Sequence, residues 1–210
     1  MYERTGNTFF LDAAEAAITA DLERCVINGN GALQVDDDWR TLPYLSGGSI
    51  GIGLVIDQFT AHRQSAAFAD AARAIRLAAS SPFYVQAGLF NGRAGMIAYL
   101  AATRDRDASG RQEARPGAGG RVARAHIDRL AWHAVPYGGG LAYPGDMLFR
   151  LSMDLGTGTA GVLLGTAAAL APRGAALPFF ARPASLPARV SGTTPAARKG
   201  ANNQSALAGR

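Results

Sequence analysis

Hydrophobic residues recur along the chain in two ways, and the two patterns predict two kinds of helix. In the ranges 11–25, 65–79 and 121–135, apolar residues are spaced three or four positions apart with charged residues between them. This spacing is typical of a helix that buries one face. Between these ranges lie stretches that are almost entirely apolar or small, as in a helix covered on all sides. The sequence therefore predicts outer and inner helices in alternation.

Each of the apolar stretches follows a Gly-x-x-Gly turn. The three turns are Gly48–Gly51, Gly92–Gly95 and Gly158–Gly161, and their first glycines are 44 and 66 residues apart. Glycine in a turn permits positive φ and close approach of the backbone. The spacing suits one helical hairpin per repeat, with residues 104–120 as an exposed insertion. We expect an all-α fold, a partial α/α toroid of about three hairpins whose inner helices begin near Gly51, Gly95 and Gly161. A compact helical bundle is the alternative.

Composition and charge divide the chain into a body and a tail. We expect one domain at residues 1–180 and a disordered basic tail at residues 181–210, where large apolar residues are few. The formal net charge is +5, but residues 172–210 hold six basic and no acidic residues, which leaves the rest at −1. The body therefore does not resemble a nucleic-acid-binding surface.

Membrane and export signals are weak in this sequence. The uncharged range 155–171 is shorter than the roughly 20 apolar residues that a membrane-spanning helix needs. The single cysteine, Cys25, excludes an intramolecular disulfide, and the first residues do not form a signal-peptide pattern. We therefore expect a cytoplasmic protein without membrane contact.

Longer motifs surround the three turns. They are WRTLPYLSGGSIGIGL at residues 39–54, GLFNGRAG at residues 88–95 and YPGDMLFRLSMDLGTGTAGVLL at residues 143–164. In this order they resemble the C-terminal, lanthionine synthetase C-like cyclase domain of class III lanthipeptide synthetases. The resemblance spans roughly residues 10–180 and implies an α/α toroid of which this chain is a C-terminal fragment. In that family, kinase and lyase domains share the polypeptide with the cyclase; their motifs do not occur here.

The resemblance also implies a function. Such a cyclase adds Cys thiols of a ribosomal precursor peptide to dehydroalanine or dehydrobutyrine, which forms (methyl)lanthionine or labionin rings. A first alternative is a non-catalytic peptide-binding module that supports the kinase and lyase domains. A second is another α/α toroid enzyme, such as a glycosidase or a terpene-type enzyme, for which only the acidic run Asp36–Asp38 offers a motif.

The residues that hold zinc in related cyclases are replaced in this chain. Those cyclases use a Trp-Cys before one turn and a Cys-His-Gly at the next, and the matching positions here hold Ser46, Phe90 and Asn91. None of these supplies a thiolate or an imidazole. The three histidines stand on predicted helices without a cysteine partner. We therefore expect neither zinc nor another cofactor.

Other groups must then favour the substrate thiolate. The N–H groups and dipoles at the inner helix N-termini are candidates, together with Arg93 in the second turn. A surface ion pair is the alternative for Arg93, and close helix packing is the alternative for the glycines. Tyr44, Ser46 and Asn91 are candidates for contact with the peptide, or else have structural roles. Asp154 is a candidate helix cap or base.

The ligand replacement gives a direct prediction. The purified chain should contain no stoichiometric zinc, because Ser46, Phe90 and Asn91 stand at the positions of the ligands. Elemental analysis after dialysis measures this, and one tightly held zinc ion per chain would contradict it.

Overall fold

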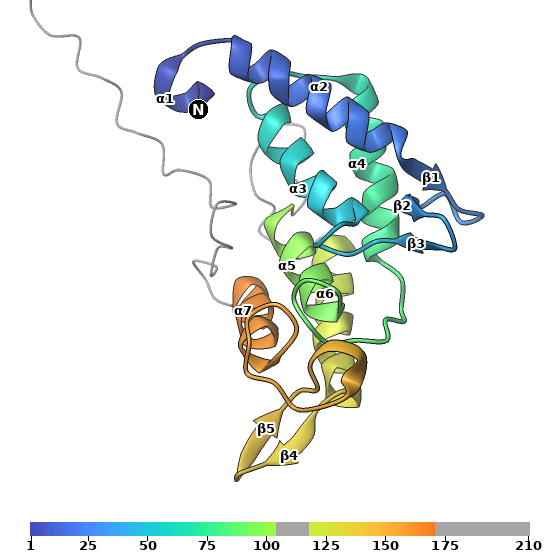
Figure 1. Ribbon diagram of the computed structural model, residues 1–210, viewed down its shortest axis with the longest axis vertical. Coiled ribbons are helices and arrows are strands. Elements are labelled where there is room, and N and C mark those ends of the chain that lie inside the picture. Colours follow the sequence, from blue (N-terminus) through green and yellow to red (C-terminus); the bar gives the residue numbers. More distant parts are fainter. Residues whose placement is uncertain (104–117, 171–210) are drawn as a thin grey trace, which may run out of the picture.

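The computed structural model describes residues 1–103 and 118–170, and these residues are mostly helical (Figure 1). The expected tail at residues 181–210 and most of the expected insertion lie outside the described residues. The α-helices of the described part are α1 (Tyr2–Thr5), α2 (Phe9–Glu23), α3 (Ser49–Thr60), α4 (Ala66–Ala79), α5 (Arg93–Ala102), α6 (Ala118–Arg129) and α7 (Thr159–Leu170). Within these ranges, no helix combines the length and the apolar character needed to cross a membrane.

The predicted inner helices are present. Helices α3, α5 and α7 each begin two residues before the second glycine of a turn, which confirms their predicted starts. Helix α5 is the central element, since it packs against α3, α4, α6 and α7. Its residues 93–100 are all buried, whereas α4 buries only one face, as the two patterns predicted. Full cover was also predicted for α3 and α7 and is wrong there, because Val55 and Leu163 are exposed.

Five short strands in the described part of the chain correct the expectation of an all-α fold. They form a three-stranded antiparallel sheet in the order β1-β2-β3 and a separate hairpin of β4 and β5. In the hairpin, Gly138 and Gly139 have φ of 58° and 79°, which suits the tight two-residue connection of antiparallel strands. The strands are β1 (Cys25–Ile27), β2 (Leu33–Asp37), β3 (Arg40–Leu42), β4 (Val135–Tyr137) and β5 (Gly140–Ala142).

Strands β1 and β4 begin at the residues where two helices were predicted to end. Cys25 was placed at the end of a helix but pairs with Val35 of β2, and Val135 was placed in a helix but pairs with Ala142 of β5. Val35 also pairs with Leu42, so the first sheet leads directly to the loop before the first glycine turn. Both sheets thus occupy the connections between an outer and an inner helix.

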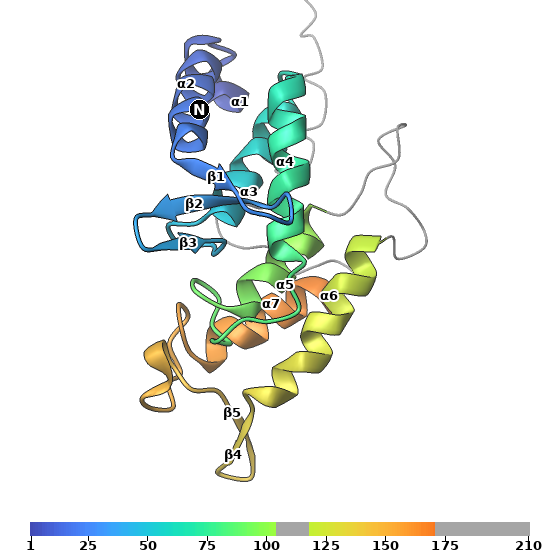
Figure 2. The ribbon, with the colours of Figure 1, turned by 90° about the vertical axis from the view of Figure 1, so that its right-hand side faces the viewer.

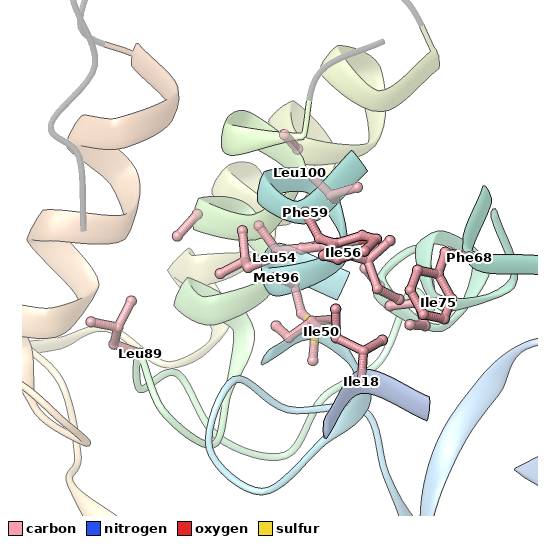
Figure 3. Packing of buried hydrophobic residues seen from close by; sticks show 14 of the residues in the cluster. Ile18, Ile50, Leu54, Ile56, Phe59, Phe68, Ile75, Leu89, Met96 and Leu100 are labelled. Atoms are coloured by element: carbon pink, nitrogen blue, oxygen red, sulfur yellow. The ribbon is translucent and has the colours of Figure 1, made fainter. Parts of the chain in front are cut away.

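The main core lies among α2, α3, α4 and α5 (Figure 3). Ile50, Ile56 and Ile75 are at most 1% exposed, and burial of each such side chain stabilises the fold by about 1.5–3 kcal/mol. A smaller cluster joins α5 and α7 to the short 3-10 turn Leu130–Trp132, which directly follows α6, through Ile97, Val162 and Leu130. The two clusters share α5, which makes that helix the link between the two ends of the described chain.

The turn glycines are needed for close approach rather than for positive φ. None of the six has positive φ; Gly48 and Gly92 are extended, with φ of −126° and −155°. A Cβ on any of the six would lie less than 3.0 Å from backbone atoms of the preceding loop. Gly161 also lies against Leu89 of the previous repeat, where an added Cβ would meet the Leu89 Cβ at 2.8 Å. The packing explanation of the glycines is therefore supported, and the positive-φ explanation is wrong.

This close approach predicts the effect of one added methyl group. Gly161→Ala should destabilise the protein by about 1–3 kcal/mol, because the new Cβ would overlap the Leu155 carbonyl and Leu89. Gly29→Ala is the control, since no atom lies within 4 Å of its Cβ position. Urea unfolding measures both, and equal midpoints for Gly161→Ala and the parent chain would count against the packing explanation.

Candidate functional site

The three glycine turns are joined by backbone hydrogen bonds at equivalent positions. The Ser46 N–H donates to the Phe90 carbonyl (2.9 Å), and the Phe90 N–H donates to the Gly156 carbonyl (2.8 Å). Each of these residues stands two positions before the first glycine of its turn. We call Ser46, Phe90 and Gly156 the turn ladder. It brings together loops that Figure 2 shows on the side of the molecule where β2 and β3 lie.

The N–H groups at the start of the inner helices already have partners. In all three helices, first-turn N–H groups donate to carbonyl groups of the preceding loop: Ile50 to Pro43, Arg93 to Gln86, Ala94 to Ala87 and Thr159 to Ser152. These bonds satisfy donors that a helix start otherwise leaves open. The expectation that these helix starts present unpaired N–H groups to a ligand is therefore corrected for these four donors.

Ser46 and Phe90, two of the three positions that the sequence resemblance matched to zinc ligands, meet at the turn ladder. Ser46 is exposed, Phe90 is 43% exposed, and Asn91 follows Phe90 directly. The Asn91 side chain donates from Nδ2 to Oδ1 of Asp146 (3.0 Å). Ser46, Phe90 and Asn91 offer a hydroxyl, a phenyl ring and an amide, which are not zinc-type ligands. Asp146 is a residue that the sequence did not single out.

Tyr44 packs toward the core. Its ring meets Tyr84 edge-on, with centroids 6.3 Å apart, and it borders the main core cluster. Burial raises the pKa of the Tyr44 hydroxyl. Its position two residues before Ser46 keeps it near the turn ladder, so contact with a peptide there stays a prediction.

Asp154 organises the loop before α7. Its carboxylate accepts hydrogen bonds from the Ser152 hydroxyl and from the N–H and hydroxyl of Thr157. These bonds, that from Ser152 foremost, hold the pKa of Asp154 well below its usual range. Helix α7 begins only at Thr159, so Asp154 closes the preceding loop instead of capping the first turn of the helix. A carboxylate held in this way is a poor base.

Arg93 is fully buried between α5 and α6. Its Nη1 donates to His126 Nδ1 (3.0 Å) and to the Pro82 carbonyl (3.3 Å), and the guanidinium lies 5.7 Å and 5.5 Å from the ring centroids of Tyr84 and Trp132. No carboxylate of the described residues pairs with it, so the surface ion pair is wrong. Full burial also removes the basis for contact between Arg93 and a solvent-borne thiolate.

His126 completes this buried contact, and the sequence analysis missed it. The side chain is 0% exposed, and its Nε2 lies 3.0 Å from the Ala79 carbonyl. Nε2 therefore carries the proton and donates to Ala79, while Nδ1 accepts from Arg93. Burial lowers the pKa of His126 to about 4. The regular spacing Val122, His126, Leu130 in the sequence was the signal that this histidine belongs to the buried face.

Comparison with known proteins finds a synthase with a similar sequence. No family model matches the chain. Over 183 residues, which are 87% of this chain, it is 48% identical to a protein described as a probable SapB synthase from Streptomyces coelicolor. The chain is similar to part of that synthase. It spans about a fifth of the length of this relative, 19%.

The buried His126 predicts a pH-dependent stability. Its pKa is about 4 in the folded chain and about 6.5 in the unfolded chain. Between these values the unfolded chain binds a proton that the folded chain does not, so the free energy of unfolding decreases as the pH falls from about 6.5 toward 4. The total decrease is about 3 kcal/mol. Urea unfolding at a series of pH values measures it.

A matched pair of variants isolates this contribution. His126→Gln keeps an amide donor for Ala79 but cannot titrate, so it should lose most of the decrease in stability. A residual decrease is expected from His133, whose pKa is also lowered by burial. His62→Gln, at an exposed histidine paired with Glu3, should retain the decrease due to His126. An unchanged pH dependence in His126→Gln would refute this assignment.

Proposed function

We propose that this chain is part of the cyclase domain of a class III lanthipeptide synthetase. In this role it adds Cys thiols of a dehydrated ribosomal precursor peptide to dehydroalanine or dehydrobutyrine. The observation that carries the proposal is the 48% identity to a probable SapB synthase over 87% of the chain. The repeated hairpins and the three turn motifs, which resemble those of class III cyclase domains, support the same assignment.

The proposed architecture is about half of an α/α toroid. Backbone bonds of the turn ladder join the loops before the three inner helices in sequence order. Val55 of α3 is 41% exposed and Leu163 of α7 is 59% exposed, although both stand on inner helices. Such apolar exposure is what an arc of a larger ring leaves at its ends. Further repeats, together with kinase and lyase domains, belong to the remainder of the proposed synthetase.

The proposed reaction takes place beside the turn ladder. A peptide thiol with a pKa of about 8.5 is mostly protonated at neutral pH and needs help to lose its proton. Arg93 is buried and Asp154 is engaged in its own loop, so neither provides that help. The polar side chains left at the ladder are those of Ser46, Asn91 and Asp146. Ser46 and Asn91, with Tyr44 beside them, contact the peptide in this proposal.

A non-catalytic peptide-binding module is the second candidate. It is favoured by the absence of thiolate and imidazole side chains at Ser46, Phe90 and Asn91. The alternative of a glycosidase or terpene-type enzyme is not supported. Asp37 of the acidic run lies in β2 and pairs with Arg40 of β3 (3.0 Å). An acidic metal motif on an inner helix would have been needed for that function.

A hybrid synthase tests the proposal. In the hybrid, this chain replaces the region of the Streptomyces coelicolor relative with which it aligns; the controls are the intact relative and a form without that region. We expect the hybrid to dehydrate and cyclise the precursor peptide and the deletion form to dehydrate it only. Mass spectrometry counts water losses, and thiol alkylation counts free cysteines.

The other outcomes decide between the candidates. Cyclisation by the deletion form at the rate of the intact relative would show that the region is not the cyclase. Loss of dehydration together with cyclisation in the deletion form would favour the binding module. A hybrid that leaves every cysteine free, like the deletion form, would overturn the proposal for this chain.

A further inference from the structure

A carboxylate from a distant loop lies beside the turn ladder. Asp146 is the first residue of the short 3-10 turn Asp146–Leu148 and is exposed to solvent. Its Oδ1 accepts a hydrogen bond from Asn91 Nδ2 at 3.0 Å, although the two residues are 55 positions apart in the sequence. Because Asn91 follows Phe90, Asp146 is held next to the positions that match a metal site in related cyclases.

The backbone that presents Asp146 is held in an unfavourable conformation. Met147 and Leu148 follow it with φ of 53° and 62°, in the left-handed region that residues other than glycine avoid. The Met147 N–H donates to Oε1 of Gln86 (3.3 Å), and the Gly145 N–H donates to the Arg150 carbonyl (2.8 Å). Such strain persists only where the surrounding structure imposes it, and it is concentrated at functional sites.

The orientation of the Asn91 amide also depends on Asp146. Oδ1 of Asn91 is buried and has no hydrogen-bond partner, which destabilises the fold. Rotating the amide by 180° would place that oxygen against the carboxylate of Asp146, where two acceptors would repel each other. The amide is therefore kept as a donor to Asp146 at the expense of its own oxygen. Gly88 lies beside this oxygen, where a Cβ would approach it to 3.1 Å.

From this geometry we infer that Asp146 is the proton acceptor for the substrate thiol and that Asn91 is its positioning residue. The inference rests on the proposed cyclase function and names the group that takes the proton from the thiol. Asp146 is exposed, and within residues 1–103 and 118–170 its only side-chain partner is the Asn91 amide on Oδ1. The second oxygen, Oδ2, is thus open to a thiol.

The proposed step is a balanced addition. As the Cys Sγ bonds to the β-carbon of dehydroalanine, the thiol proton passes to Oδ2 of Asp146. The electrons of the carbon–carbon double bond move toward the carbonyl oxygen and form an enolate. The carboxylic acid then returns the proton to the α-carbon, so thioether and free carboxylate result without an oxidant or reductant. Because proton transfer accompanies bond formation, a preformed thiolate is not required.

The test uses the hybrid synthase with Asp146→Asn. We expect its cyclisation rate to fall on the order of a hundredfold, within the usual range for loss of a general base, while the number of dehydrations stays the same. The pH profile adds an independent signature. Without the base the rate should follow the thiolate fraction, rise about tenfold per pH unit below 8.5 and approach the parent rate at high pH.

Matched variants separate catalysis from structure. Asp128→Asn removes another exposed carboxylate, paired with Arg124 on α6, and should cyclise at the parent rate. Asn91→Ala should slow cyclisation less than Asp146→Asn, and Asp146→Glu should restore part of the rate. Thermal unfolding of each variant shows whether it is folded.

Each remaining outcome has one meaning. If the parent hybrid leaves all cysteines free, the proposed function fails. If the parent cyclises and Asp146→Asn does so equally well at every pH, the inference fails and the proposed function stands. Equal, pH-independent losses in Asp146→Asn and Asp146→Glu would give Asp146 a structural role and also overturn the inference.

Discussion

The structure depends on the close approach of each glycine turn to the loop before it. Gly51, Gly95 and Gly161 lie directly over the carbonyls of Leu45, Leu89 and Leu155, which occupy the same position in each repeat. A side chain at any of these glycines would separate the inner helix from its loop. The same approach permits the backbone bonds of the turn ladder, because Ser46, Phe90 and Gly156 follow those leucines directly. Local backbone sterics thus determine how one repeat contacts the next.

The outer helix α6 is attached by a different kind of interaction. Arg93 begins the central inner helix and donates a hydrogen bond to the buried His126 of α6. Burial of a guanidinium without a carboxylate partner is unfavourable. Here the ring faces of Tyr84 and Trp132 and the neutral imidazole replace the carboxylate in part. Arg93, the charged residue of the second turn, therefore holds α5 and α6 together and is unavailable to a substrate.

The helices could be predicted because their signals are local. Apolar spacing and the repeated Gly-x-x-Gly turns gave the starts of α3, α5 and α7 within two residues. Strands β1 and β4 could not be predicted, because they are short and follow helical patterns without a break. They form only by pairing with Val35 and Ala142, and such pairing between strands leaves no local signal in the sequence. The contact of Asn91 with Asp146 was also invisible, since a separation of 55 residues has no local signature. Glycine conformation was misjudged because sequence does not distinguish positive φ from close packing.

The separation of backbone and side-chain roles explains how one scaffold suits different chemistries. The turn ladder is made of main-chain N–H and carbonyl groups, so its geometry does not require particular side chains at Ser46 and Phe90. The side chains at these positions can therefore change without loss of the backbone bonds. A carboxylate needs only one donor to hold it beside the ladder, and Asn91 supplies that donor. In the cyclase that we propose, a change of side chains beside the ladder therefore changes which group handles the proton, while the helices and turns stay in place.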